Sequence, residues 1–317
     1  MSDLERLQSW FDSGRLVRPS ADVLNFVDLI RALARLGGAE DVPDGSGVHT
    51  LATEIAEADH YVFIVVDGMG MNLVDVLPAD AFLRTHLAGE LRSVFLSTTA
   101  CALTTLATGE WPAVHAVPGW WSYLKEFGLT AVTLPFVERD TKRPLTELGV
   151  EPRKVFPTPS IWPRLTYDML TLLPERIRNS VYSTYSTGGM MQTGYVGFRD
   201  AESLLLKRVQ NAWSPTFTYL YLPELDEMVH RKGTGAVDVH QLLFSLDGQF
   251  SKLARVLRGR ARLVITSDHG LADVTEDRRF VLPEDDPLRA HLVCRPTGEP
   301  SVPIFHVHEG HEEVFRG

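Results

Sequence analysis

The chain has 317 residues, of which 44% are hydrophobic, so it is long enough for one large domain or two ordinary ones with a packed core. Its 31 Lys and Arg against 41 Asp and Glu give a net charge of −10, and it has no block of basic residues of the kind that binds duplex nucleic acid. The two cysteines, Cys101 and Cys294, are too few for a disulfide framework or a cysteine zinc site, so a bound metal would depend on Asp and His.

The N-terminal sequence contains acidic residues at its start and no apolar signal segment, and no run approaches the roughly 18 apolar residues of a membrane span. We therefore expect a cytoplasmic protein without a membrane partner. Nothing in the sequence specifies an oligomeric state.

Residues 1–58 predict a helical lead-in, because apolar residues recur with a helical period through residues 23–33 before a turn-rich stretch. Residues 61–66 then form a continuous apolar run, rich in β-branched side chains, that stops at Asp67 and Gly68. A strand that is apolar on both faces is typical of the centre of a sheet covered by helices.

Two further runs have the same character. Residues 217–222 end shortly before Asp226, and residues 263–267 end at Asp268, with a helical pattern between them at residues 239–257. This alternation predicts an α/β fold with a mostly parallel central sheet flanked by helices. Because ligands bind beyond the carboxyl ends of such strands, the acidic residues that follow the strands are expected to converge on one site.

The stretch from about residue 120 to residue 205 differs in composition, since it holds most of the segments rich in Pro, Ser, Thr and Tyr. We interpret it as an insertion that caps the site within a single domain of residues 1–317. The chain contains no internal repeat.

The strongest group of candidate site residues is Asp67, Asp226 with His230, and Asp268 with His269. A single Asp at a strand end is usually a turn or helix cap, but Asp226 and His230 also share one face of a helical turn. A mixed set of carboxylates and imidazoles suits zinc, with manganese as the main rival. Two such divalent ions a few Å apart would clamp the attacking and leaving oxygens of a phosphoryl transfer.

A second candidate group lies in the hydroxyl-rich segment 97–109. Thr99 stands just before the helix-forming residues 102–107, where free backbone N–H groups and the helix dipole stabilise an anion. One interpretation is that Thr98 or Thr99 only caps the helix. The other is that a metal activates Thr99 as a nucleophile. Cys101 has no positive neighbour in sequence and is interpreted as a small packed residue.

Four motifs occur in order along the chain: D-G at residues 67–68, S-T-T-A-C-A-L-T-T-L-A-T-G-E-W-P-A-V-H at 97–115, Y-L-P-E-L-D-E-M-V-H-R-K-G at 221–233 and S-D-H-G at 267–270. Together they resemble the alkaline phosphatase superfamily, and within it the type I phosphodiesterase and nucleotide pyrophosphatase family. The resemblance spans about residues 60–275 and implies an alkaline phosphatase-like fold.

The resemblance also implies a two-metal site with Thr99 as the covalent nucleophile. One ion would be held by Asp67, Asp268 and His269 and would contact Thr99, and the other by Asp226, His230 and a further histidine. His115 matches a family position that is not a metal ligand, and we interpret it as a packing or turn residue.

The sequence departs from the family after the nucleophile. Many relatives have F-P-N there, and its Asn helps to hold the phosphoryl oxygen, whereas this chain has Ala100, Cys101 and Ala102. Stabilisation of the phosphoryl oxygen would then depend on metal and backbone N–H groups, with Thr98 as a further helper.

A second departure concerns the last histidine ligand, which in relatives follows D-H-G by roughly a hundred residues. The candidates here are His306, His308 and His311. Three interpretations remain open: these histidines supply the missing ligand, they form a separate exposed metal-binding patch, or they lie on an edge strand without a role.

The sequence therefore predicts a metal-dependent hydrolase of phosphodiester or nucleotide pyrophosphate bonds that acts through Thr99 on a small molecule. Alternatives are a phosphomonoesterase or phosphonate hydrolase of the same superfamily, and a catalytically degenerate protein that binds metal or nucleotide. Trp120 and Trp121 are candidates for stacking on the substrate, although core packing explains them as well.

Overall fold

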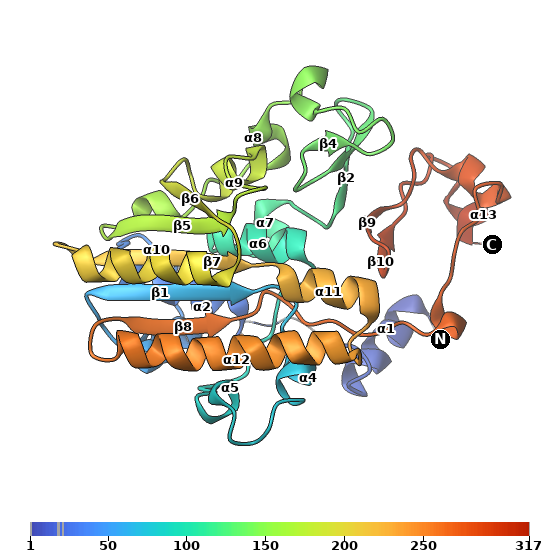
Figure 1. Cartoon of the computed structure of the whole chain (residues 1–317). Helices are drawn as coiled ribbons and strands as arrows, with labels where there is room; N and C mark the ends of the chain where they lie inside the picture. Colours follow the sequence, from blue (N-terminus) through green and yellow to red (C-terminus); the bar gives the residue numbers. More distant parts are fainter. Residues whose placement is uncertain (1, 18–19, 21, 317) are drawn as a thin grey trace.

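The computed structural model describes residues 2–17, 20 and 22–316 and has a five-stranded parallel sheet at its centre (Figure 1). Its strand order is β6 (Gln192–Tyr195), β5 (Asp168–Pro174), β7 (Thr216–Leu222), β1 (His60–Val66), β8 (Arg262–Thr266). This sheet confirms the predicted α/β fold.

The central strand β1 is buried on both faces, as its sequence predicts. Residues 61–66 are all fully buried, and successive side chains point to opposite faces of the sheet. One face contributes Tyr61, Phe63 and Val65 to the first hydrophobic core, and the other contributes Val62, Ile64 and Val66 to the second. Burying one side chain of this size completely stabilises the folded protein by about 1.5–3 kcal/mol relative to leaving it exposed.

Helices cover both faces of the sheet. The first core includes α2 (Phe26–Leu36) and α6 (Thr99–Thr108), and the second includes α10 (Phe198–Asn211), α11 (Glu224–Lys232) and α12 (Val237–Leu257). The predicted lead-in, residues 1–58, contains α1 (Asp3–Asp12), α2 and α3 (Ser46–Ile55). Since α2 packs against α6, part of this segment belongs to the core.

A second sheet is antiparallel and stands beside the first. Its strand order is β10 (Val302–Ile304), β9 (Thr297–Glu299), β2 (Trp121–Leu124), β3 (Leu129–Val132), β4 (Val137–Glu138). Two segments far apart in the sequence therefore meet in this sheet (Figure 1).

The structure differs from the predicted cap of residues 120–205. Only the part before β5 lies outside the central sheet, because β5 and β6 are strands of that sheet and α10 packs on it. The prediction placed this boundary too late because the turn-rich residues 182–189 resemble an insertion, whereas they connect two strands of the central sheet.

Short helices and turns complete the fold. They are α4 (Met71–Val74), α5 (Phe82–Thr85), α7 (Pro112–His115), α8 (Pro152–Val155), α9 (Val181–Ser186), α13 (Glu312–Arg316) and the 3-10 turns Leu145–Leu148, Trp162–Arg164, Glu276–Arg278 and Pro287–His291. Within the described residues, no helix is both long and apolar enough to cross a membrane.

Candidate active site

The loops after β1 and β8 lie against each other at the carboxyl edge of the sheet. Gly68 has a φ of +71°, and its N–H donates to Oδ1 of Asp268 at 3.1 Å. A Cβ at this position would lie 2.7 Å from the Leu271 side chain. Glycine is required here for its backbone conformation and for this close approach, which brings Asp67 and Asp268 together.

Asp67, Asp226 and His269 form a buried group whose ligand atoms all lie within 4.8 Å of one another. The Nε2 atom of His269 is 3.3 Å from Oδ1 of Asp67 and 3.5 Å from Oδ2 of Asp268. Its Nδ1 is 2.9 Å from the carbonyl oxygen of Gly270, which can only accept, so Nδ1 carries the hydrogen. The lone pair of Nε2 therefore points to the carboxylates, as a metal ligand requires.

The electrostatics of this group favour a cation. Burial, together with Asp268 and Asp226, holds the pKa of Asp67 well above its usual value. Burial also raises the pKa of Asp226, although His230 and His269 oppose the shift. Oδ1 of Asp226 and Oδ2 of Asp268 are buried without a hydrogen-bond partner among the described residues. Buried oxygens with unused lone pairs fit a bound divalent metal.

Thr99 is the first residue of α6 and faces this group. Its Oγ1 lies 3.0 Å from Nε2 of His269 and 3.5 Å from Oδ1 of Asp67. The helix packs tightly because Ala100, Cys101 and Ala102 are small and fully buried. The residues that replace F-P-N therefore form part of the hydrophobic core.

Thr98 is the N-cap residue of α6, but its side chain does not cap the helix. Its Oγ1 instead donates to Oε1 of Glu299 at 2.7 Å. The hydroxyl hydrogen is thus already used, so Thr98 has no free donor for a phosphoryl oxygen in this arrangement.

Two residues that the sequence analysis gave no role contact the site. The Tyr221 hydroxyl donates to Oδ2 of Asp67, and Glu299 contacts Thr98. The alternation within β7 places Tyr221 and Tyr219 on one face of the sheet, which is a signal that could have identified Tyr221. No local pattern marks Glu299, because its position depends on the pairing of distant strands.

The residues predicted to hold the second metal ion, Asp226 and His230, lie in a more open place. Nε2 of His230 lies 3.4 Å from Oδ1 of Asp226, and the His230 side chain is 68% exposed. The C-terminal histidines lie outside the group of Asp67, Asp226 and His269. His306 contacts Thr297 at 2.8 Å, the two Nδ1 atoms of His291 and His311 are 3.0 Å apart, and the rings of His308 and His311 are 5.7 Å apart.

The predicted aromatic residues lie where the second sheet meets the core. Trp120 is half-buried and packs against the first core. The guanidinium of Arg139 lies 3.9 Å from the ring centre of Trp121, so one face of this ring already has a partner.

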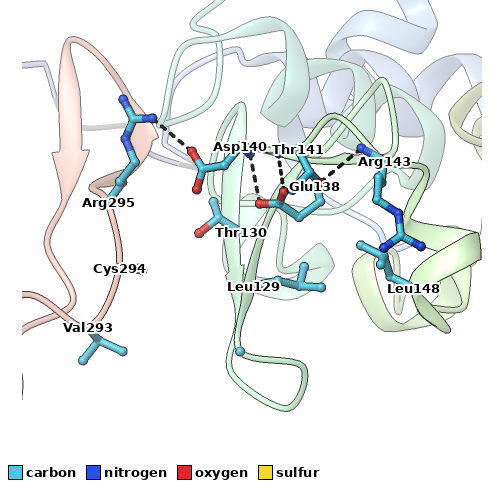
Figure 2. A pocket seen from close by; sticks show the side chains of 11 residues that line it. Leu129, Thr130, Glu138, Asp140, Thr141, Arg143, Leu148, Val293, Cys294 and Arg295 are labelled. Carbon is cyan, nitrogen blue, oxygen red and sulfur yellow. Dashed lines mark hydrogen bonds and ion pairs between the residues drawn. The ribbon is translucent and has the colours of Figure 1, made fainter.

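A hollow of about 530 Å³ lies on the second sheet (Figure 2). It is lined by residues of β3 and β4 with Val293, Cys294 and Arg295, and none of the predicted site residues lines it. Burial raises the pKa of the Cys294 thiol, so this side chain is not an activated nucleophile.

Comparisons with known proteins identify the family and a shared fold. A family model described as type I phosphodiesterase / nucleotide pyrophosphatase matches residues 61–311. Murine ectonucleotide pyrophosphatase / phosphodiesterase 5, as an inactive variant in complex with AMP, has 17% sequence identity and a TM-score of 0.56. The human protein of the same name has 18% identity and a TM-score of 0.57. Each comparison covers 80% of this chain and 68% of the other.

At these identities the solved structures show the fold, and they agree with the expected alkaline phosphatase-like architecture. No curated protein matches the chain. The family model covers most of the chain and includes Thr99 and the three acidic strand ends. The chain therefore belongs to the type I phosphodiesterase and nucleotide pyrophosphatase family.

Proposed function

We propose that the protein hydrolyses phosphodiester or nucleotide pyrophosphate bonds in a metal-dependent reaction, with Thr99 as the nucleophile. The observation that carries this proposal is the position of the Thr99 hydroxyl, 3.0 Å from His269 and beside the buried group of Asp67, Asp226 and His269. A hydroxyl that only capped its helix would not need to contact both His269 and the Asp67 carboxylate.

The candidate ligands form two sets, one for each metal ion. Asp67, Asp268 and His269 would hold one divalent ion and Asp226 and His230 another, with His306, His308 or His311 as an additional ligand. When bound, such ions lower the pKa of a hydroxyl and neutralise charge on the phosphoryl group. Zinc suits the mixed oxygen and nitrogen donors, and manganese is the alternative.

In the proposed reaction the Thr99 hydroxyl releases its proton to solvent as its oxygen bonds to phosphorus, and the bond from phosphorus to the leaving oxygen breaks. The leaving oxygen takes up a proton from solvent. Water then hydrolyses the phosphothreonine ester and restores the hydroxyl. Tyr221 contributes by donating its hydrogen to Asp67, which fixes the orientation of that carboxylate. The N-terminal end of α6 faces the phosphoryl oxygens with its free backbone N–H groups.

A nucleotide is the proposed substrate class. Its support is the AMP bound to the inactive variant of the murine protein, which shares this fold. We propose the same class of ligand for this chain.

The test is hydrolysis of bis-p-nitrophenyl phosphate by protein stripped of metal and then supplied with Zn²⁺ or Mn²⁺. We expect metal to restore turnover in the wild type, and Thr99→Ala to lower it by about a thousandfold or more, because the bond-forming oxygen is absent. Thr99→Ser is the matched control, since it keeps the hydroxyl, and it should retain far more activity than Thr99→Ala.

Two results would contradict the proposal. One is a Thr99→Ala variant as active as the wild type. The other is folded wild-type protein that binds metal but turns over no phosphodiester, which would favour a catalytically degenerate binding protein.

A further inference from the structure

Glu299 connects the second sheet to the N-terminal end of the nucleophile helix. Its Oε1 accepts a hydrogen bond from the Thr98 hydroxyl at 2.7 Å and another from the backbone N–H of Trp120 at 2.6 Å. Thr98 is the neighbour of Thr99. A carboxylate from the end of β9 is thus held against Thr98, the residue before the proposed nucleophile.

The backbone holds Glu299 in this place. Gly298 pairs with Trp121 across β9 and β2 and has a φ of +76°. A Cβ on Gly119 would lie 2.6 Å from the carbonyl oxygen of Gly298, so the two chain segments touch without room for a side chain. The position of Glu299 is therefore built into the packing of the two segments and does not depend on a flexible surface side chain.

The charge of Glu299 has no cationic partner. Within the part of the chain that the structure describes, no Lys, Arg or His forms an ion pair with it, whereas Asp140 pairs with Arg295 at 3.0 Å. Both hydrogen bonds to Glu299 come from neutral donors, a threonine hydroxyl and a backbone N–H. An anion that reaches Thr99 would therefore approach a carboxylate that contacts the preceding residue and that carries no paired cation among the described residues.

Phosphodiesters and phosphomonoesters differ in the negative charge that their phosphoryl group carries. The phosphoryl group of a diester carries one negative charge, and that of a monoester approaches two above about pH 6. A second negative charge several Å from a partly buried carboxylate weakens binding by about ten- to a hundredfold at an effective dielectric constant of about 20.

We propose that Glu299 is a specificity-determining residue that selects phosphodiesters over phosphomonoesters by repelling the second negative charge. This inference rests on the proposed function, because it takes Thr99 as the point of attack on the phosphoryl group.

The experiment compares Glu299→Gln with the wild type on a diester, bis-p-nitrophenyl phosphate, and a monoester, p-nitrophenyl phosphate, at about pH 8 where the monoester is a dianion. The Gln side chain oxygen can accept both hydrogen bonds, so the substitution removes the charge and keeps the anchor. We expect the ratio of kcat/KM for the monoester to that for the diester to rise about tenfold or more. The dissociation constant of AMP, measured by calorimetry on metal-loaded protein, should fall by a similar factor.

The matched control is Glu138→Gln on β4. Glu138 also accepts hydrogen bonds from a threonine hydroxyl and a backbone N–H, both of Thr141, but it lies on the hollow of the second sheet (Figure 2). We expect this variant to leave the ratio and the AMP affinity unchanged.

An unchanged ratio and AMP affinity in Glu299→Gln would overturn the inference. So would an equal loss of both activities in Glu299→Gln and Glu299→Ala, since that result assigns Glu299 a purely structural role. If the wild type binds metal and AMP but cleaves neither ester, the proposed function fails, and the AMP affinity of Glu299→Gln still decides whether the charge repels a dianion.

Discussion

His115 is a side chain whose protonation is set by burial. It is fully buried at the end of α7, and burial lowers its pKa to about 4. The Val117 N–H donates to Nδ1 at 3.2 Å, so Nε2 carries the hydrogen and donates to the Thr105 hydroxyl at 3.1 Å. Both ring nitrogens are used by packing partners, in agreement with the interpretation of His115 as a packing residue.

His115 leads to a prediction about pH. Between pH 6.5 and 4 the unfolded chain binds a proton on this ring that the folded protein excludes, so the free energy of unfolding falls as pH falls. The loss attributable to His115 is at most about 3 kcal/mol. We expect urea unfolding at pH 7.0 and pH 4.5 to show a smaller drop for His115→Gln than for the wild type.

The comparison with the wild type isolates His115 from other titrating groups, since the carboxylates at the site also change protonation on acidification. His49→Gln is the control, because the His49 side chain is 61% exposed. An equal pH dependence in wild type and His115→Gln would show that the buried ring does not exclude the proton.

At the scale of elements, the contact between β9 and the segment before β2 connects the second sheet to the start of α6, which carries Thr99. Gly119 and Gly298 touch there, and Glu299 follows directly. The strand pairing is short, because only Trp121 and Gly298 are paired between β2 and β9. Close backbone contact therefore matters more for this joint than a long ladder of hydrogen bonds.

We expect Gly119→Ala to lower the free energy of unfolding by about 1–3 kcal/mol, since its Cβ would overlap the carbonyl of Gly298 and force the segments apart. Chemical denaturation measures this change. Gly248→Ala in α12 is the control: a Cβ there meets nothing within 4 Å, and alanine favours a helix, so stability should stay equal or rise. Full stability of Gly119→Ala would contradict the packing described here.

At the scale of the whole molecule, the carboxyl edge of the central sheet concentrates negative charge. Asp67, Asp226 and Asp268 come from three different parts of the chain, and burial with mutual repulsion holds the pKa of Asp67 well above its usual value. In linkage terms the metal-free fold is destabilised by this group at neutral pH and gains stability as pH falls and Asp67 takes up a proton. A bound cation removes the same repulsion.

Metal binding should therefore stabilise the whole fold. At a free metal concentration of a hundred times Kd, the stabilisation is about 2.7 kcal/mol for one site. Thermal unfolding after chelation and after addition of Zn²⁺ measures this stabilisation.

The Asp67→Asn variant should be more stable than the wild type without metal, because one buried charge is gone. It should gain much less stability than the wild type when metal is added. A variant that loses stability without metal and gains as much from Zn²⁺ as the wild type would refute the metal assignment.

The sequence by itself determined the local features of this protein. The apolar run at residues 61–66 specifies a strand buried on both faces, and the motifs around Asp67, Thr99 and Asp268 identify the family. These features are readable because burial pattern, helix start and motif spacing depend on residues close together in the chain.

Only the tertiary structure decided which distant segments pair. It placed β5 and β6 in the central sheet, joined β9 to β2 across the molecule, and brought Glu299 to Thr98 and Tyr221 to Asp67. The physical reason is that strand pairing and close backbone contact depend on how whole elements pack, and local sequence patterns do not encode that packing. The family and the central strand can thus be predicted from local patterns, whereas the surroundings of the candidate site require the fold.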